Sequence, residues 1–140
     1  MDNYEIAKHF SLLSKLMEIH GENSFKSKTY SIAAYKIDQL TVELQTLSAE
    51  KNFSINGIGE AIGKKILELT GSGKMKSLEE LLSKTPEGIL EMMNIKGIGP
   101  KKISIIWKEM NVENIGELLY ACHENRLSLL KGFGKKPRIM

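Results

Sequence analysis

The chain has 140 residues, 41% hydrophobic and 26% charged, which is enough for one globular domain or two small ones sharing a core. No apolar run approaches the roughly 18 residues that a membrane span needs. One cysteine, Cys122, excludes an intrachain disulfide, and with the three histidines it shows no zinc-ligand spacing. The net charge of +3 is mild, and the whole composition is typical of a cytoplasmic protein without membrane partners.

Apolar residues recur at helical spacing and predict an all-α chain of about nine short helices. The first helix is expected over Tyr4–His20, with Gly21 at its C-terminus. The second helix starts near Ser24 and either continues or breaks briefly through Val42, Leu44 and Leu47. Five of its residues are expected to face the core: Phe25, Ala33, Ala34, Ile37 and Leu40. A short helix or turn is expected over Lys51–Ile55.

The second half of the chain has clearer helix boundaries. A helix through Ile62, Ile66 and Leu69 ends at Gly71–Gly73. Ser77 and Glu80 predict a capping box, and Thr85 before Pro86 predicts an N-cap for a helix reaching about Asn94. Pro100 opens a helix that places four residues on one face: Ile103, Ile106, Trp107 and Met110. Asn114 and Glu117 predict a cap for a helix ending near Asn125, and a last short helix is expected over Arg126–Leu130.

One short pattern occurs three times, as INGIG at 55–59, IKGIG at 95–99 and LKGFG at 130–134. Two glycines around one apolar residue allow a tight reversal between helices, with Ile58, Ile98 or Phe133 packed between them. The first N–H groups of the next helix then form an anion site suited to a phosphodiester oxygen. The pattern predicts DNA contacts that read no bases, at Gly57, Gly59, Lys64, Gly97, Gly99, Lys101, Lys102, Gly132, Gly134, Lys135 and Lys136.

The charges are segregated along the sequence. Of the 20 basic residues, 16 fall in the windows 26–36, 64–76, 96–108 and 126–138, which contain only one of the 17 acids, Glu68. A solvated surface without a charged partner usually interleaves the two signs. The segregation therefore predicts one positive and one negative face, and an acidic polymer as partner.

Four linked stretches of the sequence resemble the N-terminal region of bacterial family X DNA polymerases. More distantly, they resemble the lyase and adjoining domain of DNA polymerase beta. The stretches are 21–37, 55–82, 85–103 and 125–136. The resemblance implies a bundle with tandem helix-hairpin-helix motifs, divided into a lyase-like domain over 1–83 and a second domain over 84–140. Asp2 and Asp38, the only aspartates, cannot form a two-metal polymerase site. Six residues follow Gly134, with Pro137 among them, so the third copy is truncated, which favours a piece of a longer polymerase over a stand-alone relative.

The resemblance also implies a nucleophile. Lys65 matches the lysine that forms a Schiff base with 5′-deoxyribose phosphate in the lyase domain, and Lys26 and Tyr30 match residues that hold its 5′-phosphate. Partial burial and a neighbouring cation, such as Lys64, favour the neutral amine that this chemistry needs. Family lysines are replaced at Phe53, Ala61 and Ser77. Lys65 is either this nucleophile or one more phosphate contact.

The resemblance further implies a weakly held K⁺ or Na⁺ at the hairpins, bound by the main-chain carbonyls of Phe53, Ile55 and Ile58 and of Met93, Ile95 and Ile98. No other cofactor is expected. The implied partner is gapped, nicked or duplex DNA in a repair setting. The alternative is a non-catalytic helical module that binds other proteins through acids such as Glu79, Glu80, Glu87 and Glu91.

Overall fold

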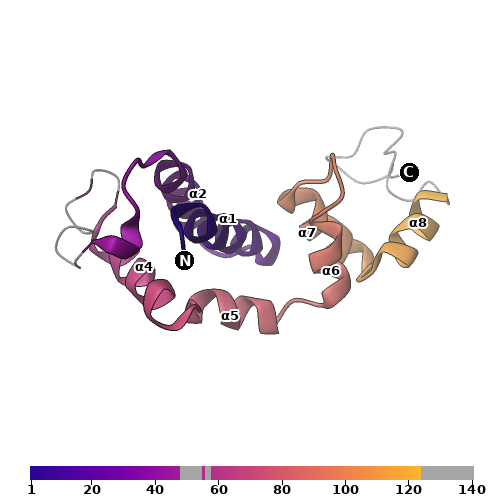
Figure 1. Cartoon of the computed structure of the whole chain (residues 1–140). Helices are drawn as coiled ribbons and strands as arrows, with labels where there is room; N and C mark the ends of the chain where they lie inside the picture. Colours follow the sequence, from indigo (N-terminus) through magenta and orange to yellow (C-terminus); the bar gives the residue numbers. More distant parts are fainter. Residues whose placement is uncertain (48–54, 56–57, 124–140) are drawn as a thin grey trace. The chain divides into compact units, whose positions relative to one another are not determined.

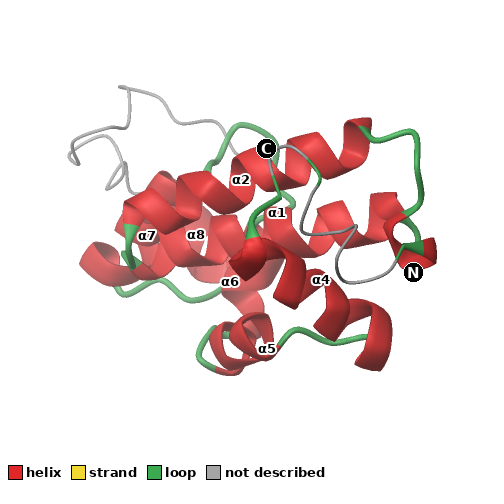
Figure 2. Cartoon of the chain, turned by 90° about the vertical axis from the view of Figure 1, so that its left-hand side faces the viewer, coloured by secondary structure: helices red, strands yellow, loops and turns green. Residues whose placement is uncertain are grey.

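The computed structural model describes residues 1–47, 55 and 58–123. These residues form seven α-helices and one 3₁₀ turn, without a strand (Figure 2), so the all-α prediction is confirmed. Among them no helix is both long and apolar enough to cross a membrane. The expected helix over 126–130 and the start of the expected turn over 51–55 lie outside the described ranges.

The chain divides into two compact units. Unit 1 comprises Met1–Glu18 and Glu22–Ser83, and unit 2 comprises Ile19–Gly21 and the chain from Lys84 onward. Each unit is described by itself below.

In unit 1, the helices α1 (Asn3–His20) and α2 (Ser24–Gln39) pack side by side (Figure 1). Two buried serines join them. The hydroxyl of Ser14 donates to the carbonyl of Ser27 at 2.7 Å, and the hydroxyl of Ser27 donates to the carbonyl of Ser14 at 3.0 Å. Because both hydroxyls are satisfied, two small polar residues can occupy the helix contact without a desolvation cost.

The buried face of α2 differs from the one expected. Ala33, Ala34 and Ile37 are buried as predicted, but Phe25 is 79% exposed and Ser27 is buried instead. The prediction for Phe25 was wrong because Ser27 and the two alanines set the face that contacts α1. The helix is interrupted after α2: within residues 40–47, which the structure describes, the chain forms the 3₁₀ turn η1 (Leu44–Thr46), with Leu44 buried.

Unit 1 continues with α4 (Glu60–Ser72) and α5 (Lys76–Ser83). The end of α4 at the glycine-rich stretch is confirmed, with Gly73 in the left-handed conformation at φ +79°. The capping box at Ser77 was wrong. Helix α5 already begins at Lys76, and the Ser77 hydroxyl accepts a hydrogen bond from Lys65 of α4 instead.

Unit 2 contains α6 (Glu87–Met92), α7 (Pro100–Met110) and α8 (Ile115–His123). Its core is built from apolar side chains of all three helices, among them Ile89, Met92, Ile103, Ile106 and Leu118. The expected cap of α8 is present, because Asn114 Oδ1 accepts from the N–H of Glu117 at 2.8 Å.

The start of α6 differs from the prediction. Pro86, not Thr85, is the residue before the first helical position, and no side chain caps the helix. Thr85 is buried, and its Oγ1 lies 2.8 Å from Nε2 of His20. The His20 ring also meets the edge of Trp107 at 5.2 Å between centroids. Trp107 is therefore a half-buried packing residue of unit 2.

Candidate nucleic-acid interface

The described parts of the first two glycine hairpins have the same backbone hydrogen bond and a similar conformation at the last glycine. In the first, the N–H of Ile58 donates to the carbonyl of Ile55 at 3.0 Å, and in the second the N–H of Ile98 donates to the carbonyl of Ile95 at 3.4 Å. The glycine that ends each hairpin then starts a helix. Gly59 has φ −86° and ψ −176°, and Gly99 has φ −89° and ψ 174°. Two sequences 40 residues apart thus agree in the parts of the hairpin that the structure describes in both.

Neither hairpin supplies a side chain to cap the helix that follows. Gly59 and Gly99 are the N-cap residues of α4 and α7, and neither helix has a side-chain cap hydrogen bond. Both glycines are exposed, and a Cβ placed on either would meet nothing within 4 Å. An anion can therefore reach the first turn of each helix, where backbone N–H groups and the helix dipole favour negative charge.

Glycine, isoleucine and proline residues shape these turns. Gly97 has φ +90°, a backbone conformation that residues other than glycine adopt only at an energetic cost. Ile58 is 3% exposed and packs into unit 1 as expected, whereas its counterpart Ile98 is half-buried. Pro100 occupies the first turn of α7, as predicted, and removes one N–H from it.

The lysines near the two hairpins differ in their surroundings. Lys64 is 69% exposed and lies 3.4 Å from Glu60 one turn earlier, a contact worth little in water. Lys101 is exposed and Lys102 is half-buried. The remaining predicted contact residues lie outside the described ranges: Gly57, Gly132, Gly134, Lys135 and Lys136.

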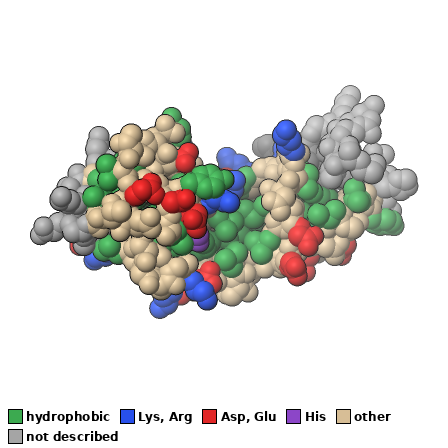
Figure 3. Space-filling view, viewed as in Figure 1, with side chains coloured by type: hydrophobic (Ala, Val, Ile, Leu, Met, Phe, Trp, Pro, Cys, Tyr) green, Lys and Arg blue, Asp and Glu red, His purple; other side chains and the backbone are tan. Residues whose placement is uncertain are grey.

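The face in Figure 3 carries both acidic and basic side chains. This view does not present a purely positive face, and the Lys64–Glu60 pair shows the two signs side by side in unit 1. The candidate interface therefore depends on the hairpin geometry more than on a uniform charged face.

A second feature of unit 1 is a small polar cluster around Lys65. This lysine is half-buried on α4, and its Nζ donates to Ser77 Oγ at 2.7 Å. The same Nζ lies 5.8 Å from the ring centroid of Tyr30, within cation–π range. Tyr30 in turn packs on Phe10, with 6.0 Å between ring centroids, and burial raises the pKa of its phenol above 10.0.

The residues matched to a 5′-phosphate site lie on one helix. Lys26 and Tyr30 are four residues apart on α2, so they share a face. The side chain of Lys26 is exposed, and its N–H donates to Asn23 Oδ1 at 3.1 Å in the helix cap. The structure thus brings Lys65, Ser77 and Tyr30 together, and places Lys26 one turn from Tyr30. Ala61 is exposed, and Phe53 lies outside the described ranges.

The carbonyls matched to a cation site are partly engaged. Those of Ile55 and Ile95 each accept one backbone hydrogen bond within their hairpin, which leaves one lone pair on each oxygen. Within the described part of the chain, no three His, Cys, Asp or Glu side chains are grouped so as to hold a metal ion.

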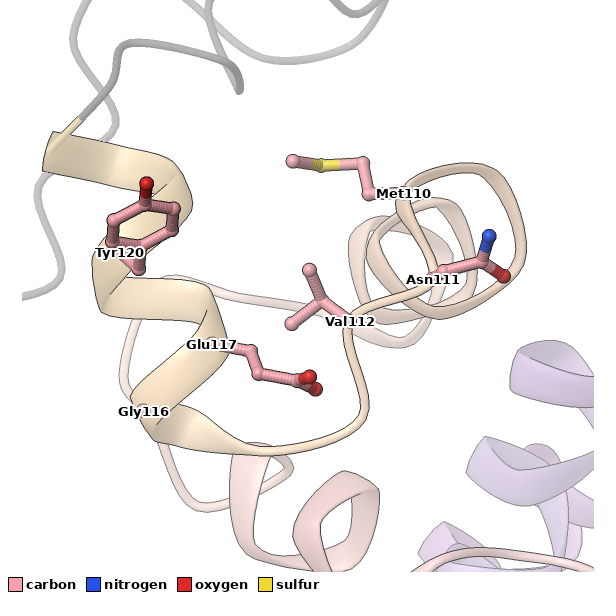
Figure 4. Close-up of a pocket in the computed structure, with 6 residues that line it drawn as sticks. All are labelled: Met110, Asn111, Val112, Gly116, Glu117 and Tyr120. Atoms are coloured by element: carbon pink, nitrogen blue, oxygen red, sulfur yellow. The ribbon is translucent and has the colours of Figure 1, made fainter.

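Unit 2 also has a pocket of about 350 Å³ where α7 ends and α8 begins (Figure 4). Met110 and Val112 lie on one side of it, and Glu117 and Tyr120 of α8 on the other. The carboxylate of Glu117 accepts a hydrogen bond, because the N–H of Glu113 donates to its Oε1 at 2.9 Å. This hydrogen bond ties the first turn of α8 to the residues before the helix.

Comparison with known proteins gives two family matches and one relative. Residues 1–75 match a model described as a helix-hairpin-helix domain, and residues 89–137 match a SAM-like helix-hairpin-helix tandem. The chain is 32% identical over 136 residues to the DNA polymerase/3′-5′ exonuclease PolX of Bacillus subtilis (strain 168). The match covers 97% of this chain and 24% of that protein, and confirms the resemblance to bacterial family X polymerases. With its two matched segments and the glycine hairpin in each, the chain belongs to the helix-hairpin-helix domain family.

Proposed function

We propose that this chain binds DNA through the phosphate backbone, without reading base sequence, as the N-terminal region of a DNA-repair polymerase. The observation that carries the proposal is the repeated hairpin with an uncapped, exposed glycine before a helix at Gly59 and at Gly99. Support also comes from the Bacillus subtilis relative, which is named as a DNA polymerase and exonuclease.

The salt dependence of affinity tests this proposal. Each phosphate contact contributes a slope of roughly −0.9 to log K against log salt, so three to five contacts give about −3 to −5. Fluorescence anisotropy with two duplexes of unrelated sequence should give the same slope and similar affinities. A slope near zero, or a strong preference for one sequence, contradicts phosphate binding and favours the alternative of a protein-interaction module.

A matched pair of variants locates the contact. Lys101→Ala, next to the second hairpin, removes one cation and should make the slope less steep by about one. Lys15→Ala removes an equally exposed cation from α1, far along the chain from either hairpin, and should leave the slope unchanged. Equal effects of the two variants would mean that only net charge matters.

A second candidate function is a 5′-deoxyribose-phosphate lyase in unit 1. The observation that favours it is a half-buried lysine, Lys65, held by Ser77 beside the ring of Tyr30. In this reaction the Nζ lone pair attacks the C1′ aldehyde and a Schiff base forms with loss of water. Abstraction of a C2′ proton then expels the 3′ phosphate by β-elimination.

Borohydride trapping on a 5′-incised abasic duplex tests the lyase. Wild type should become covalently linked to the strand, Lys65→Ala should lose most of the product, and Lys64→Ala should lose less. Lys26→Ala and Tyr30→Phe should weaken substrate binding while keeping the nucleophile. Lys65→Arg decides the role of Lys65, because a guanidinium keeps its charge but not a nucleophilic amine. Full trapping by that variant removes Lys65 as the nucleophile, and no trapping by wild type removes the lyase.

A weak K⁺ or Na⁺ bound between hairpin carbonyls and a DNA phosphate completes the proposal. The free lone pairs on the carbonyls of Ile55 and Ile95 support it. DNA affinity should fall several-fold when K⁺ is replaced at equal ionic strength by tetramethylammonium, which is too large for the turn. Equal affinities in the two salts would contradict the cation.

A further inference from the structure

The contact between Lys65 and Ser77 has a consequence for the lyase chemistry. Ser77 Oγ lies 2.7 Å from Lys65 Nζ and accepts its hydrogen. Among the described residues, the hydroxyl of Ser77 donates no hydrogen bond to a protein atom. A hydroxyl in this position can take a proton from the nitrogen and pass its own proton to a third atom.

Schiff-base formation needs such a transfer. When the lone pair of Nζ bonds to C1′, the carbonyl electron pair moves to oxygen, which leaves a positive nitrogen and a negative oxygen on the same carbon. Direct transfer of a proton from nitrogen to oxygen would pass through a strained four-membered ring. With one hydroxyl between them the ring has six members, and both hydrogen bonds can be nearly linear.

We propose that Ser77 is the proton relay of Schiff-base formation at Lys65. This inference rests on the proposed lyase function. In the first pass Ser77 Oγ takes a proton from Nζ and gives its own proton to the alkoxide, which forms a neutral carbinolamine. In the second pass it takes the remaining N–H proton and protonates the hydroxyl, which leaves as water while the nitrogen lone pair forms the C=N bond. The serine ends unchanged, and the imine takes up one proton from water before β-elimination.

The surroundings suit this role. Lys65 on α4 and Ser77 on α5 are both half-buried, so a bound aldehyde would meet them with less competing water than at an exposed lysine. The ring centroid of Tyr30 lies 5.8 Å from Nζ, so this ring limits the directions open to the amine. Burial raises the pKa of Tyr30, which keeps its phenol protonated and removes it as a base that would compete with Ser77.

The experiment measures the rate at which borohydride-trappable imine accumulates, in a single turnover with the full chain in excess over incised abasic duplex. Ser77→Ala should slow accumulation about 10²-fold, the low end of the range for acid–base catalysis. Ser77→Thr keeps a hydroxyl and should stay within a few-fold of wild type. The matched control is Ser83→Ala, which removes an exposed hydroxyl bonded only within the same helix α5 and should have no effect.

A solvent isotope measurement separates a relay from a serine that merely holds Lys65. In mixtures of light and heavy water, two protons in flight give wild type a curved dependence of rate on deuterium fraction. Ser77→Ala should lose the curvature as well as the rate. If wild type traps and Ser77→Ala is slower with the curvature retained, or equally fast, the relay is refuted while the lyase stands. If wild type does not trap at all, both fail.

Discussion

Gly99→Ser should stabilise unit 2 and weaken DNA binding at the same time. Gly99 has the extended backbone of an ordinary N-cap, and a Cβ there meets nothing within 4 Å, so serine fits without strain. Its hydroxyl would accept from the N–H groups in the first turn of α7. The cap, together with the lower entropy of the unfolded chain, should raise the free energy of unfolding by about 0.5–1 kcal/mol.

The same hydroxyl would occupy the N–H groups that a phosphate needs. A hydrogen bond to a charged group contributes about 1.5–3 kcal/mol, so DNA affinity should fall about 10- to 100-fold at 1.4 kcal/mol per factor of ten. Gly99→Asp should lose more, because its carboxylate also repels the phosphate. Urea unfolding followed by the fluorescence of Trp107, the only tryptophan, reports on unit 2, and anisotropy reports on DNA binding.

Gly71→Ala is the control for stabilisation without a cap. It lies in α4 with nothing within 4 Å of its Cβ, so alanine should stabilise unit 1 by about 0.5–1 kcal/mol and leave DNA affinity unchanged. A Gly99→Ser variant that is more stable and binds DNA as tightly as wild type refutes a phosphate at the start of α7. A variant that is less stable would mean that the hairpin itself has changed shape.

Three further predictions concern stability. Gly97→Ala, at φ +90°, should cost about 1–2 kcal/mol in urea unfolding through backbone strain alone, since its Cβ has open space; a loss below about 0.3 kcal/mol would show that this turn relaxes freely. Gly88→Ala should cost about 1–3 kcal/mol by overpacking, because its Cβ would overlap the carbonyl oxygen of Glu113 and lie 2.7 Å from Asn114 Cα; an unchanged midpoint would contradict this contact. Burial raises the pKa of Tyr30 in the folded state, so the folded state favours the protonated phenol. The stability that this preference contributes is present below about pH 10 and is lost as the pH rises through the folded-state pKa. Wild type should therefore lose more unfolding free energy than Tyr30→Phe between about pH 9 and about pH 11, and equal losses would refute the role of burial.

Local signals in the sequence were enough to predict the hairpins and the ends of the helices beside them. Proline at position 100, glycines at 71–73, and Asn114 with Glu117 act within a few residues of themselves, and the structure confirms each. The repeated glycine pattern is also local, which explains why two turns 40 residues apart could be expected to share one geometry.

Long-range contacts explain the errors. Ser77 and Thr85 both looked like helix caps, but their hydroxyls bond Lys65 and His20, which are 12 and 65 residues away. Phe25 was expected to be buried because it is large and apolar. The reciprocal hydrogen bonds between Ser14 and Ser27 instead place Ser27 on the buried face of α2. A pattern based on hydrophobicity does not place serine in a core, so the sequence pattern alone could not have predicted the buried face of α2.

If both hairpins bind phosphate as proposed, the location of one hairpin in each compact unit makes the chain bivalent. If each turn holds a single phosphate only weakly, the second contact becomes intramolecular once the first has formed, and its effective concentration depends on the chain that joins the units. Avidity would then let two short-lived contacts give a long-lived complex, while either turn could release and rebind a neighbouring phosphate. A protein built in this way can stay on a DNA strand and still move along it.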